Sequence, residues 1–477
     1  LMTKVETTPA IIDGETVITD EIIEVRAPFD GNLVGSVPRC GKEHLDRAVK
    51  AAHRELKANA LAPWERAAIL DRVAELLVER RDAFAHLIAS EAGKPITVAE
   101  GEAGRAVNTL TYAAIAARTL TGETVPMAGT EKGDGTIAWT ERVPIGVIGA
   151  ISPFNFPLNL VCHKVAPAIA AGCPVVLKPA SATPLTALML AEVFAEAGLP
   201  AGWLNVVTAP GSESSALVEH EDVAMITFTG SPDVGWGIKE SAPRKKVTLE
   251  LGNNAPVIVE PDADLDVVVP KLRTGGFLYS GQTCIAIQRI YAHSDIHDEL
   301  LERLKAEVEQ IVTGDPLDHD TEVSALIESG ETDRVEGWIE DAVRAGATRV
   351  TGGGRNHDGA VLMPTVLAGV TPDMEVSKTE LFGPAVGVAS YDTFDEAVGM
   401  ANNSRYGLQA SVFTSSLQRA MEAAERIDFG SVLINEQPNW RTDQMPYGGV
   451  RDSGNTKEGP PYAVEEMTRE RLIIIRT

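Results

Sequence analysis

Residues 143–251 alternate short apolar runs with helical patterns, and this alternation constrains the fold more than any other feature of the chain. The apolar runs are predicted strands, at residues 143–151, 174–177, 204–207, 224–228 and 247–251. The helical patterns between them begin at Leu158, Pro184 and Val234. Strands that alternate with helices need right-handed crossovers and form a parallel sheet. The sequence therefore predicts a Rossmann-like, doubly wound α/β domain whose ligand lies at the carboxyl ends of the strands.

A second series of strands and helices follows the first. Its predicted strands stand at residues 256–259, 289–293, 385–391, 410–413 and 432–435. Its predicted helices begin at Leu265 or span residues 296–312, 333–345, 394–402 and 417–427. Residues 42–120 precede both series and have helical periodicity, which is clearest over 65–80. A chain of 477 residues exceeds what one hydrophobic core usually organises, so we predict two large α/β domains.

Two β-prone segments fit neither series. Residues 122–142 have strand-like stretches around a turn at 133–135, and residues 471–476 are apolar and β-branched. Unpaired edges of this kind are association surfaces, so we expect the segments to pair with each other or with another subunit. We therefore predict a homo-oligomer, either a dimer or a tetramer. The predicted divisions are a first domain of residues 1–119 and 143–252, a second of residues 253–452, and a small β oligomerisation element of residues 120–142 and 453–477.

The charge balance excludes some functions. The chain has 42 Lys and Arg against 68 Asp and Glu, a formal charge of −26, which argues against a nucleic-acid partner because polyphosphates are bound by clustered cations. Residues 143–163 contain no charge, but prolines and asparagines interrupt them, so we expect a buried strand, a turn and a helix start rather than a membrane span. An enzyme with a small-molecule substrate is the favoured class.

The four cysteines lie far apart and form no metal-binding or disulfide pattern, so we predict no metal site. Residues 1–15 have no apolar core typical of a signal peptide. Both observations favour a reducing, cytoplasmic location.

Three residues could take part in catalysis. Cys284 lies in the sequence Ser-Gly-Gln-Thr-Cys; a lone cysteine is usually a small buried hydrophobe, but this polar turn could present a thiolate to a cleft. Glu250 ends the last strand of the first series, which we expect to be central in its sheet, and burial would raise its pKa toward that of a general base. Asn155 stands between two prolines, either as a turn residue or as an amide donor to an oxyanion.

Other polar residues follow the predicted strands. Lys178 ends the second strand, and residues 228–231 end the fourth and open a helix, where Ser231 could receive phosphate oxygens. Neither site is a GxGxxG fingerprint. Taken alone, Glu380 is a surface acid before a Gly-Pro turn, and the glycine-rich residues 446–454 form a turn.

In their order along the chain, these motifs resemble the aldehyde dehydrogenase superfamily. The resemblance runs from about residue 20 to the C-terminus, and residues 159–181 and 459–468 look most like its lactaldehyde dehydrogenase-like branch. The motifs are PFNFP at 153–157, KPAS at 178–181, FTGS at 228–231, LELGNN at 249–254, GQTC at 281–284, ELFGP at 380–384, NNSRYGLQASVF at 402–413 and PYGGVRDSG at 446–454.

The resemblance implies an aldehyde dehydrogenase-like fold and NAD(P)-dependent oxidation of an aldehyde to an acid. Cys284 would form a thiohemiacetal and then a thioester, Asn155 and the Cys284 N–H would hold the oxyanion, and Glu250 would activate the hydrolytic water. Lys178 completes the implied catalytic set. The implied cofactor residues are Ile151, Ser152, Pro153, Lys178, Ala180, Ser181, Gly211, Phe228, Thr229, Gly230, Ser231, Leu251, Gly252, Glu380 and Phe382. The implied substrate residues are Thr111, Thr283, Ile285, Arg441 and Tyr447.

Comparison with relatives narrows the ligands. Relatives that accept phosphorylated aldehydes carry Arg at the positions of Thr111 and Thr283, which leaves Arg441 as the predicted anchor for a carboxylate or hydroxyl. Relatives that prefer NAD often carry Glu at the position of Ser181, so we expect use of either NAD or NADP. Many relatives have glycine at the position of Asn253. A side chain there would limit how closely other groups can approach the backbone.

Two alternatives stay open. CoA-acylating relatives transfer the acyl group to CoA, but they typically lack the glutamate at the position of Glu250. Some proteins of this fold are structural or binding proteins without activity, and fold alone does not exclude them. The presence of Cys284, Asn155 and Glu250 favours an enzyme that uses water.

Overall fold

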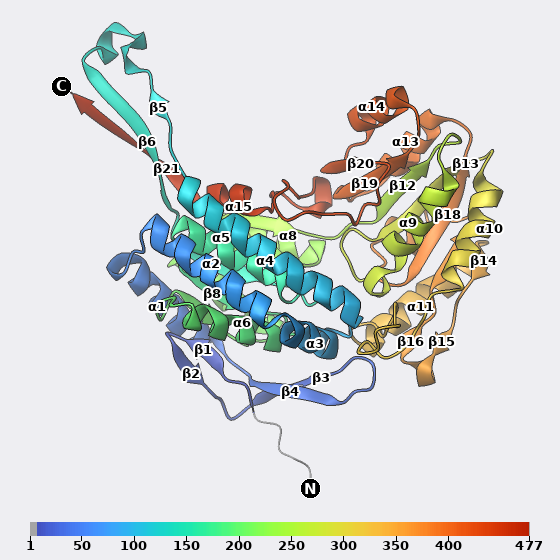
Figure 1. Ribbon diagram of the computed structural model, residues 1–477, viewed down its shortest axis with the longest axis horizontal. Coiled ribbons are helices and arrows are strands. Elements are labelled where there is room, and N and C mark those ends of the chain that lie inside the picture. Colours follow the sequence, from blue (N-terminus) through green and yellow to red (C-terminus); the bar gives the residue numbers. More distant parts are fainter. Residues whose placement is uncertain (1–6, 477) are drawn as a thin grey trace.

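The computed structural model describes residues 7–476 and has two lobes, each built on a seven-stranded sheet (Figure 1). Residues 1–6, part of the N-terminus predicted to lack a signal core, lie outside the described residues. In the first sheet the five strands from β7 to β11 are parallel, so their carboxyl ends share one edge. The strand order is β11 (Lys246–Glu250), β10 (Val223–Thr229), β7 (Val147–Ile151), β8 (Val175–Lys178), β9 (Leu204–Val206), β1 (Ala10–Ile12) and β2 (Glu15–Val17).

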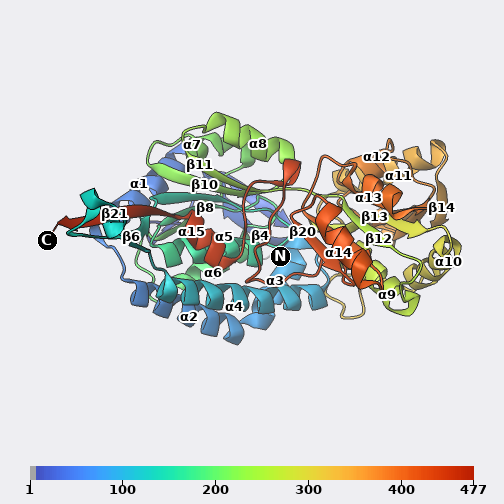
Figure 2. The ribbon, with the colours of Figure 1, turned by 90° about the horizontal axis from the view of Figure 1, so that it is seen from above.

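Helices cover both faces of the first sheet, as Figure 2 shows. Successive residues of β7 point to opposite faces, so Ile148 and Val147 belong to two different apolar cores. The core around Ile148 includes α2 (Pro63–Glu79), α3 (Arg81–Ala92), α4 (Ile96–Thr119), α5 (Asn159–Ala171) and α6 (Leu185–Glu196). The core around Val147 includes α1 (Lys42–Ala58), α7 (Ser215–Val218) and α8 (Pro232–Ser241).

The second sheet is parallel except for one edge strand, β14. Its order is β14 (Thr348–Thr351), β17 (Thr365–Ala368), β18 (Ala385–Tyr391), β13 (Ile287–His293), β12 (Ala255–Val259), β19 (Gln409–Phe413) and β20 (Ser431–Ile434). The helices of this part of the chain are α9 (Leu265–Phe277), α10 (His297–Val308), α11 (Ser329–Arg344), α12 (Glu375–Lys378), α13 (Phe394–Asn402) and α14 (Leu417–Arg426). Only residues 251–254 separate β11 from β12. The chain therefore passes directly from the carboxyl ends of the strands in the first sheet to the amino ends of the strands in the second.

The two β-prone segments pair with each other, which confirms one of the two predicted arrangements. β21 (Thr468–Arg476) lies antiparallel to β6 (Thr136–Pro144) along its whole length, and β5 (Thr124–Val125) pairs with the other edge of β6. The resulting sheet projects from the first lobe (Figure 1). The predicted strand at 143–151 is wrong in its first residues, because β6 extends to Pro144 and Gly146, at a φ of 142°, separates it from β7.

The prediction that the Glu250 strand is central is also wrong, because β11 is an edge strand of its sheet. Residues 453–455 cover that edge. The Asn455 side chain accepts from the Leu249 N–H at 2.8 Å and donates to the Val247 carbonyl at 3.0 Å. The Leu251 N–H donates to the Ser453 carbonyl at 3.0 Å. Because residues 453–455 cover this edge, the side chains of β11 are buried as those of a central strand would be. Glu250 is only 2% exposed.

Some elements carried no clear sequence signal. The antiparallel pair β3 (Ile22–Arg26) and β4 (Leu33–Pro38) was not predicted, nor were β1, β2, β14 and β17. The short strand pair β15 (Arg355–Asn356) and β16 (Val361–Leu362) and the C-terminal helix α15 (Pro460–Glu466) were also missed. Within residues 7–476, no helix has the length and apolar character needed to cross a bilayer.

Candidate functional site

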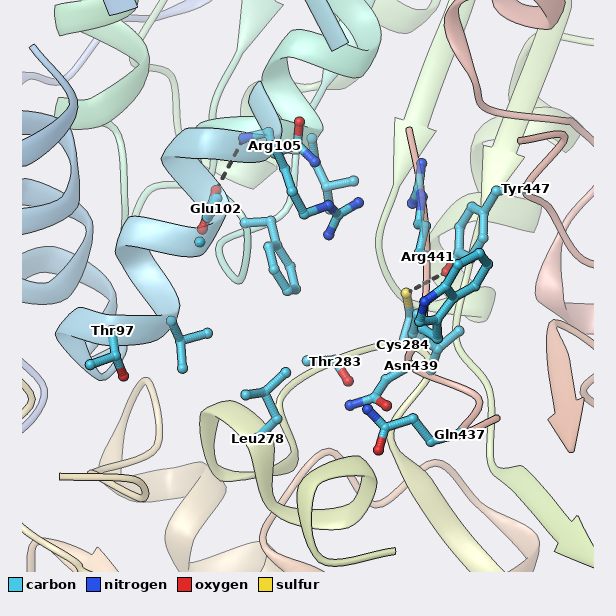
Figure 3. Close-up of a pocket in the computed structure, with 17 residues that line it drawn as sticks. Thr97, Glu102, Arg105, Leu278, Thr283, Cys284, Gln437, Asn439, Arg441 and Tyr447 are labelled. Atoms are coloured by element: carbon cyan, nitrogen blue, oxygen red, sulfur yellow. Dashed lines mark hydrogen bonds between the residues drawn. The ribbon is translucent and has the colours of Figure 1, made fainter. Parts of the chain in front are cut away.

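A cavity of about 580 Å³ lies between the two lobes (Figure 3). The first lobe contributes α4 and α5, including Arg105. The second contributes the turn before β13, with Thr283 and Cys284, and the loop after β20, with Arg441 and Tyr447. The cavity therefore brings together residues that are far apart in the chain.

Cys284 follows a strained turn. Tyr279 and Ser280 have φ of 50° and 55°, a conformation that side chains rarely adopt. Their side chains hold the turn, because the Tyr279 hydroxyl donates to the Ala92 carbonyl and the Ser280 hydroxyl to the Ser324 carbonyl, each at 2.8 Å. Of the four free cysteines, only Cys284 is not fully buried. The turn thus presents this one thiol to the cavity.

Asn155 is tied to the same turn. Its Nδ2 donates to the carbonyl oxygen of Gln282 at 3.0 Å. The loop that carries Asn155 is fixed in turn by the buried carboxylate of Glu102, which pairs with Lys94 and accepts from the backbone N–H of Leu158 at 2.9 Å. A carboxylate at this place also favours the N-terminus of α5. The amide of Asn155 therefore has a fixed position beside the Cys284 turn.

Glu250 is buried at the end of β11, and its Oε1 has no hydrogen-bond partner within the described chain. Burial raises the pKa of Glu250 well above its ordinary value, and the nearby charge of Glu458 raises it further. Burial likewise raises the pKa of the Cys284 thiol, with the charge of Glu250 adding to the effect. The site thus combines a thiol and a desolvated carboxyl group that influence each other.

Tyr447 and Arg441 lie beside the thiol of Cys284 (Figure 3). The Tyr447 hydroxyl lies 2.9 Å from the Cys284 Sγ, and the Arg441 guanidinium lies 3.7 Å from the centre of the Tyr447 ring. Arg441 also donates to Glu458 at 3.0 Å. Burial alone would raise the pKa of Glu458, but the cations Arg441 and Lys164 outweigh it and lower the pKa to about 2.

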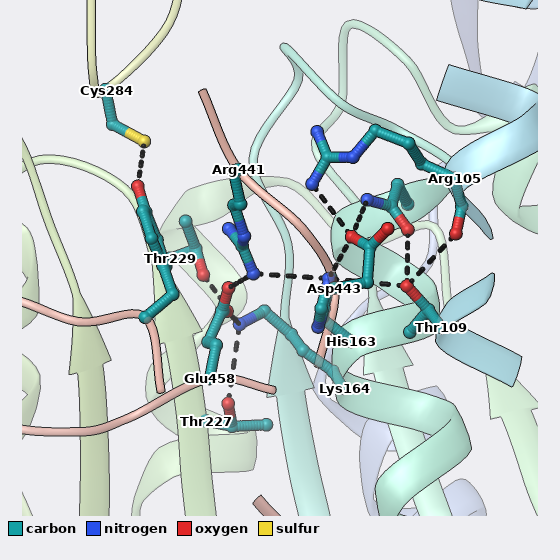
Figure 4. Close-up of polar contacts among 12 residues, drawn as sticks. Arg105, Thr109, His163, Lys164, Thr227, Thr229, Cys284, Arg441, Asp443 and Glu458 are labelled. Atoms are coloured by element: carbon teal, nitrogen blue, oxygen red, sulfur yellow. Dashed lines mark hydrogen bonds and ion pairs between the residues drawn. The ribbon is translucent and has the colours of Figure 1, made fainter. Parts of the chain in front are cut away.

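A second group of polar side chains centres on Asp443, which is 3% exposed. Its Oδ1 lies 3.1 Å from His163 Nε2 and accepts from Arg105 at 2.8 Å and from Asn159 at 3.2 Å (Figure 4). Sequence reasoning missed this group. The available signal was the occurrence of Asn159, His163 and Lys164 in an otherwise apolar helical sequence. All residues of this helix, α5, are buried, and buried polar side chains need partners.

Four of the five predicted substrate residues line the cavity: Thr283, Ile285, Arg441 and Tyr447. Thr111 does not. Its side chain is exposed on α4, and its hydroxyl donates to the Val107 carbonyl at 2.9 Å. Arg105 lines the cavity instead, and a residue six positions further along a helix lies on a different face because a turn takes 3.6 residues.

The predicted cofactor residues gather at the carboxyl edge of the first sheet. Lys178 ends β8, and its Nζ donates to the carbonyls of Pro179 and Ala209 at 3.1 and 3.2 Å. Burial lowers the pKa of Lys178 to about 8. Ser231 immediately precedes α8, at a helix N-terminus suited to phosphate oxygens. The others at this edge lie in or after the strands or in the following loops: Ile151, Ser152, Pro153, Ala180, Ser181, Gly211, Phe228, Thr229, Gly230, Leu251 and Gly252.

Glu380 reaches this edge from the second lobe. Its Oε1 accepts from the Asn253 N–H at 3.0 Å, and burial raises its pKa to about 7. A Cβ at Gly252 would lie 2.3 Å from Glu380 Oε2, so this glycine is needed for the contact. The Asn253 side chain, expected to narrow the backbone approach, donates to the Gln409 carbonyl at 3.2 Å. It therefore points into the second lobe. Phe382 meets Phe154 edge to face, with ring centres 5.9 Å apart.

Within residues 7–476, no group of three or more His, Cys, Asp or Glu side chains is arranged to hold a metal ion.

The chain is similar to known proteins over almost its whole length. The sequence model of the aldehyde dehydrogenase family matches residues 16–473. The chain is 45% identical over 475 residues to a 3-sulfolactaldehyde dehydrogenase from Priestia aryabhattai, with 99% of each chain covered.

Two solved structures extend the likeness to the fold. Aldehyde dehydrogenase 21 from Physcomitrella patens, solved with its reaction product succinate, has a TM-score of 0.96 at 37% identity over 99% of each chain. An NADP-dependent glyceraldehyde-3-phosphate dehydrogenase from Bacillus halodurans, solved with NADP, has the same TM-score, identity and coverage. The predicted fold class and resemblance are confirmed: this chain belongs to the aldehyde dehydrogenase family.

Proposed function

We propose that the protein oxidises an aldehyde to its carboxylic acid, with NAD or NADP as the hydride acceptor. The observation that carries the proposal is that Cys284 lines the inter-lobe cavity, that Asn155 is hydrogen-bonded to the turn before it, and that the buried Glu250 is close enough for its charge to raise the pKa of the thiol. Cys284 attacks the aldehyde carbon, and the Asn155 amide and the Cys284 N–H stabilise the resulting oxyanion. When bound, the nicotinamide accepts the hydride, which leaves a thioester on Cys284. Glu250 then takes a proton from the water that hydrolyses this thioester.

The residues at the carboxyl edge of the first sheet fit the proposed cofactor. The N-terminus of α8, with Ser231, is suited to the pyrophosphate, and Lys178 and Glu380 are suited to ribose hydroxyls. Lys178 is counted among the catalytic residues because it would hold the cofactor in position for the reaction. Ser181 carries no charge that would repel a 2′-phosphate, so NAD and NADP are both accepted. A 37%-identical relative was solved with NADP, which supports the proposal.

We further propose that the substrate is a small aldehyde with an acidic group at its far end. Arg441, the anchor expected from the sequence, is occupied by Glu458 and the Tyr447 ring. Arg105 remains, because its side chain is 30% exposed whereas that of Arg441 is only 5% exposed. The Thr283 hydroxyl and the Asn439 amide in the same cavity lack hydrogen-bond partners among residues 7–476. Unpaired donors of this kind are suited to a carboxylate or sulfonate.

The names of the relatives agree with an acidic substrate. One relative is a 3-sulfolactaldehyde dehydrogenase, and another was solved with its product succinate. Transfer of the acyl group to CoA, and a purely structural role, remain the alternative functions. The buried, unpartnered carboxyl oxygen of Glu250 favours water over CoA.

Replacement Cys284→Ser should abolish aldehyde oxidation, because a serine hydroxyl is far less ionised and less nucleophilic than a thiol. We expect turnover below a few per cent of wild type in an assay of NAD(P)H formation, with cofactor binding nearly unchanged by fluorescence titration. Cys162→Ser, at a buried position in α5 that does not line the cavity, is the control. Substantial activity in Cys284→Ser would contradict the assignment of the nucleophile.

Replacement Glu250→Gln should slow deacylation, so that a burst of reduced cofactor survives with little steady-state turnover. Only the ionised carboxylate accepts a proton. Because the pKa of Glu250 is raised, the wild-type steady-state rate should increase with pH through that pKa, and the variant should lose this dependence. Stopped-flow absorbance at several pH values measures both quantities. Simultaneous loss of burst and steady state would assign Glu250 to thiol activation or structure.

Replacement Arg105→Gln should reduce kcat/KM for succinic semialdehyde or 3-sulfolactaldehyde by roughly tenfold or more, because a charge-assisted hydrogen bond to the substrate anion is lost. Propanal has no such anion, so its kcat/KM should change little. Arg118→Gln, at an exposed arginine on the same helix that pairs with Asp71, is the matched control. An equal loss with all three aldehydes would show that Arg105 has only a structural role.

We also propose that the protein is a dimer or a dimer of dimers through the β5–β6–β21 sheet. β21 is an edge strand whose Leu472, Ile474 and Ile475 are each about half exposed. Deletion of residues 472–477 should give a monomer or an aggregate with lower activity, although no proposed site residue is removed. Light scattering of the intact chain at micromolar concentration is the measurement. A monodisperse monomer near 51 kDa would refute the proposal.

A further inference from the structure

The Tyr447 hydroxyl is directed at the Cys284 thiol. Its oxygen lies 2.9 Å from Sγ, and the phenol has no other hydrogen-bond partner among residues 7–476. The tyrosine is 1% exposed, and its backbone exchanges hydrogen bonds with that of Glu458 in both directions, at 3.2 and 2.6 Å. The side chain therefore has little freedom to turn away from the sulfur.

The chemistry of the pair decides which atom donates. Burial raises the pKa of Tyr447 well above its ordinary value, and the charges of Cys284 and Glu250 add to that effect. The phenol therefore holds its proton more firmly than an exposed tyrosine does. When the sulfur is ionised, only the phenol has a proton to donate, and the contact becomes a charge-assisted hydrogen bond to the thiolate.

Arg441 lies over the Tyr447 ring and strengthens the Tyr447 hydroxyl as a hydrogen-bond donor. Its guanidinium lies 3.7 Å from the ring centre and is fixed there by Glu458 at 3.0 Å and by His163 at 3.2 Å. A cation over the ring withdraws electron density from it, which makes the hydroxyl a stronger hydrogen-bond donor. The position of Arg441 therefore affects the sulfur through the tyrosine.

The other groups around the sulfur act mainly against ionisation. Burial and the carboxyl groups of Glu250 and Glu380 raise the pKa of Cys284, whereas the Tyr447 hydrogen bond and the charge of Arg441 lower it. The remaining charges nearby are Lys164, Lys457 and Glu458, and they act on Glu250. A thiol whose pKa is raised by desolvation and by two carboxyl groups needs a compensating hydrogen-bond donor if a useful fraction of it is to be a thiolate.

We propose that Tyr447 is a catalytic residue whose hydroxyl stabilises the Cys284 thiolate, and that Arg441 is a positioning residue that acts through the Tyr447 ring. In the ionisation the S–H bond breaks, the proton passes to solvent, the sulfur keeps the electron pair and the phenol O–H stays intact. The inference rests on the proposed function only in that Cys284 is the nucleophile.

The test is the pH dependence of Cys284 alkylation by iodoacetamide in the full-length, cofactor-free protein, followed by mass spectrometry of the modified peptide. Tyr447→Phe keeps the ring and its contact with Arg441 but removes the hydroxyl. We expect its alkylation midpoint to rise by about one pH unit or more, so that alkylation at a fixed pH below the midpoint is roughly tenfold slower. The same shift should appear in the pH profile of the burst rate.

Arg441→Lys keeps a cation beside Glu458 but removes the planar contact with the ring. We expect a smaller upward shift than in Tyr447→Phe, and no further shift when Arg441→Lys is added to Tyr447→Phe, because the arginine then has no hydroxyl to act through. Full additivity of the two shifts would overturn the assigned role of Arg441.

Tyr391→Phe is the matched control, because Tyr391 is a buried tyrosine of β18 whose hydroxyl donates to the Val259 carbonyl at 3.0 Å. Its alkylation midpoint should equal that of the wild type. Equal midpoints for Tyr447→Phe and wild type, or an equal shift in Tyr391→Phe, would overturn the inference. Alkylation needs no aldehyde, so it tests this inference separately from the proposed function. If the protein oxidises aldehydes but Tyr447→Phe leaves the alkylation midpoint unshifted, only this inference fails. If the shift is present without oxidation, the proposed function fails instead.

Discussion

The main-chain pairing between the first sheet and the loop after β20 is the interaction on which the site depends. Residues 453–455 bond to the open edge of β11, and the same loop brings Tyr447 and Glu458 to its carboxyl end. Without this covering, Glu250 would stand on an exposed edge with an ordinary pKa. One loop of the second lobe therefore creates the low-dielectric environment in which residues of both lobes lie.

The buried charges of the site are divided between two arginines. Arg441 is held by Glu458 and the Tyr447 ring and is 5% exposed, whereas Arg105 shares Asp443 with His163 and is 30% exposed. Buried ion pairs contribute little net stability, because desolvation offsets their attraction, but they fix the direction of the side chains that form them. The buried Arg441 thus fixes the direction of the Tyr447 ring, and the more exposed Arg105 is the one proposed to meet a substrate anion.

Much of the fold followed from local patterns, because the strands and helices of both α/β series have strong periodicity and lie in the continuous cores. The edge position of β11 did not follow, because strand order depends on contacts between distant segments. The motifs gave Cys284, Asn155 and Glu250 by resemblance. They did not include Arg105 and Asp443, which lie in no motif that was recognised. They included Thr111, whose side chain lies outside the cavity, since the direction of a helical face is known only when the neighbouring helices are known.

The site also retains features that a stability optimum would remove. A strained turn precedes Cys284, and the Oε1 of Glu250 is buried with no partner in the described chain. Each costs of the order of 1–3 kcal/mol of folding free energy, and each serves the proposed reaction. The strain directs the thiol into the cavity, and the unpaired oxygen is left free to accept a proton from water. Substitutions that relieve these costs are therefore the ones that would stabilise the protein and reduce its activity.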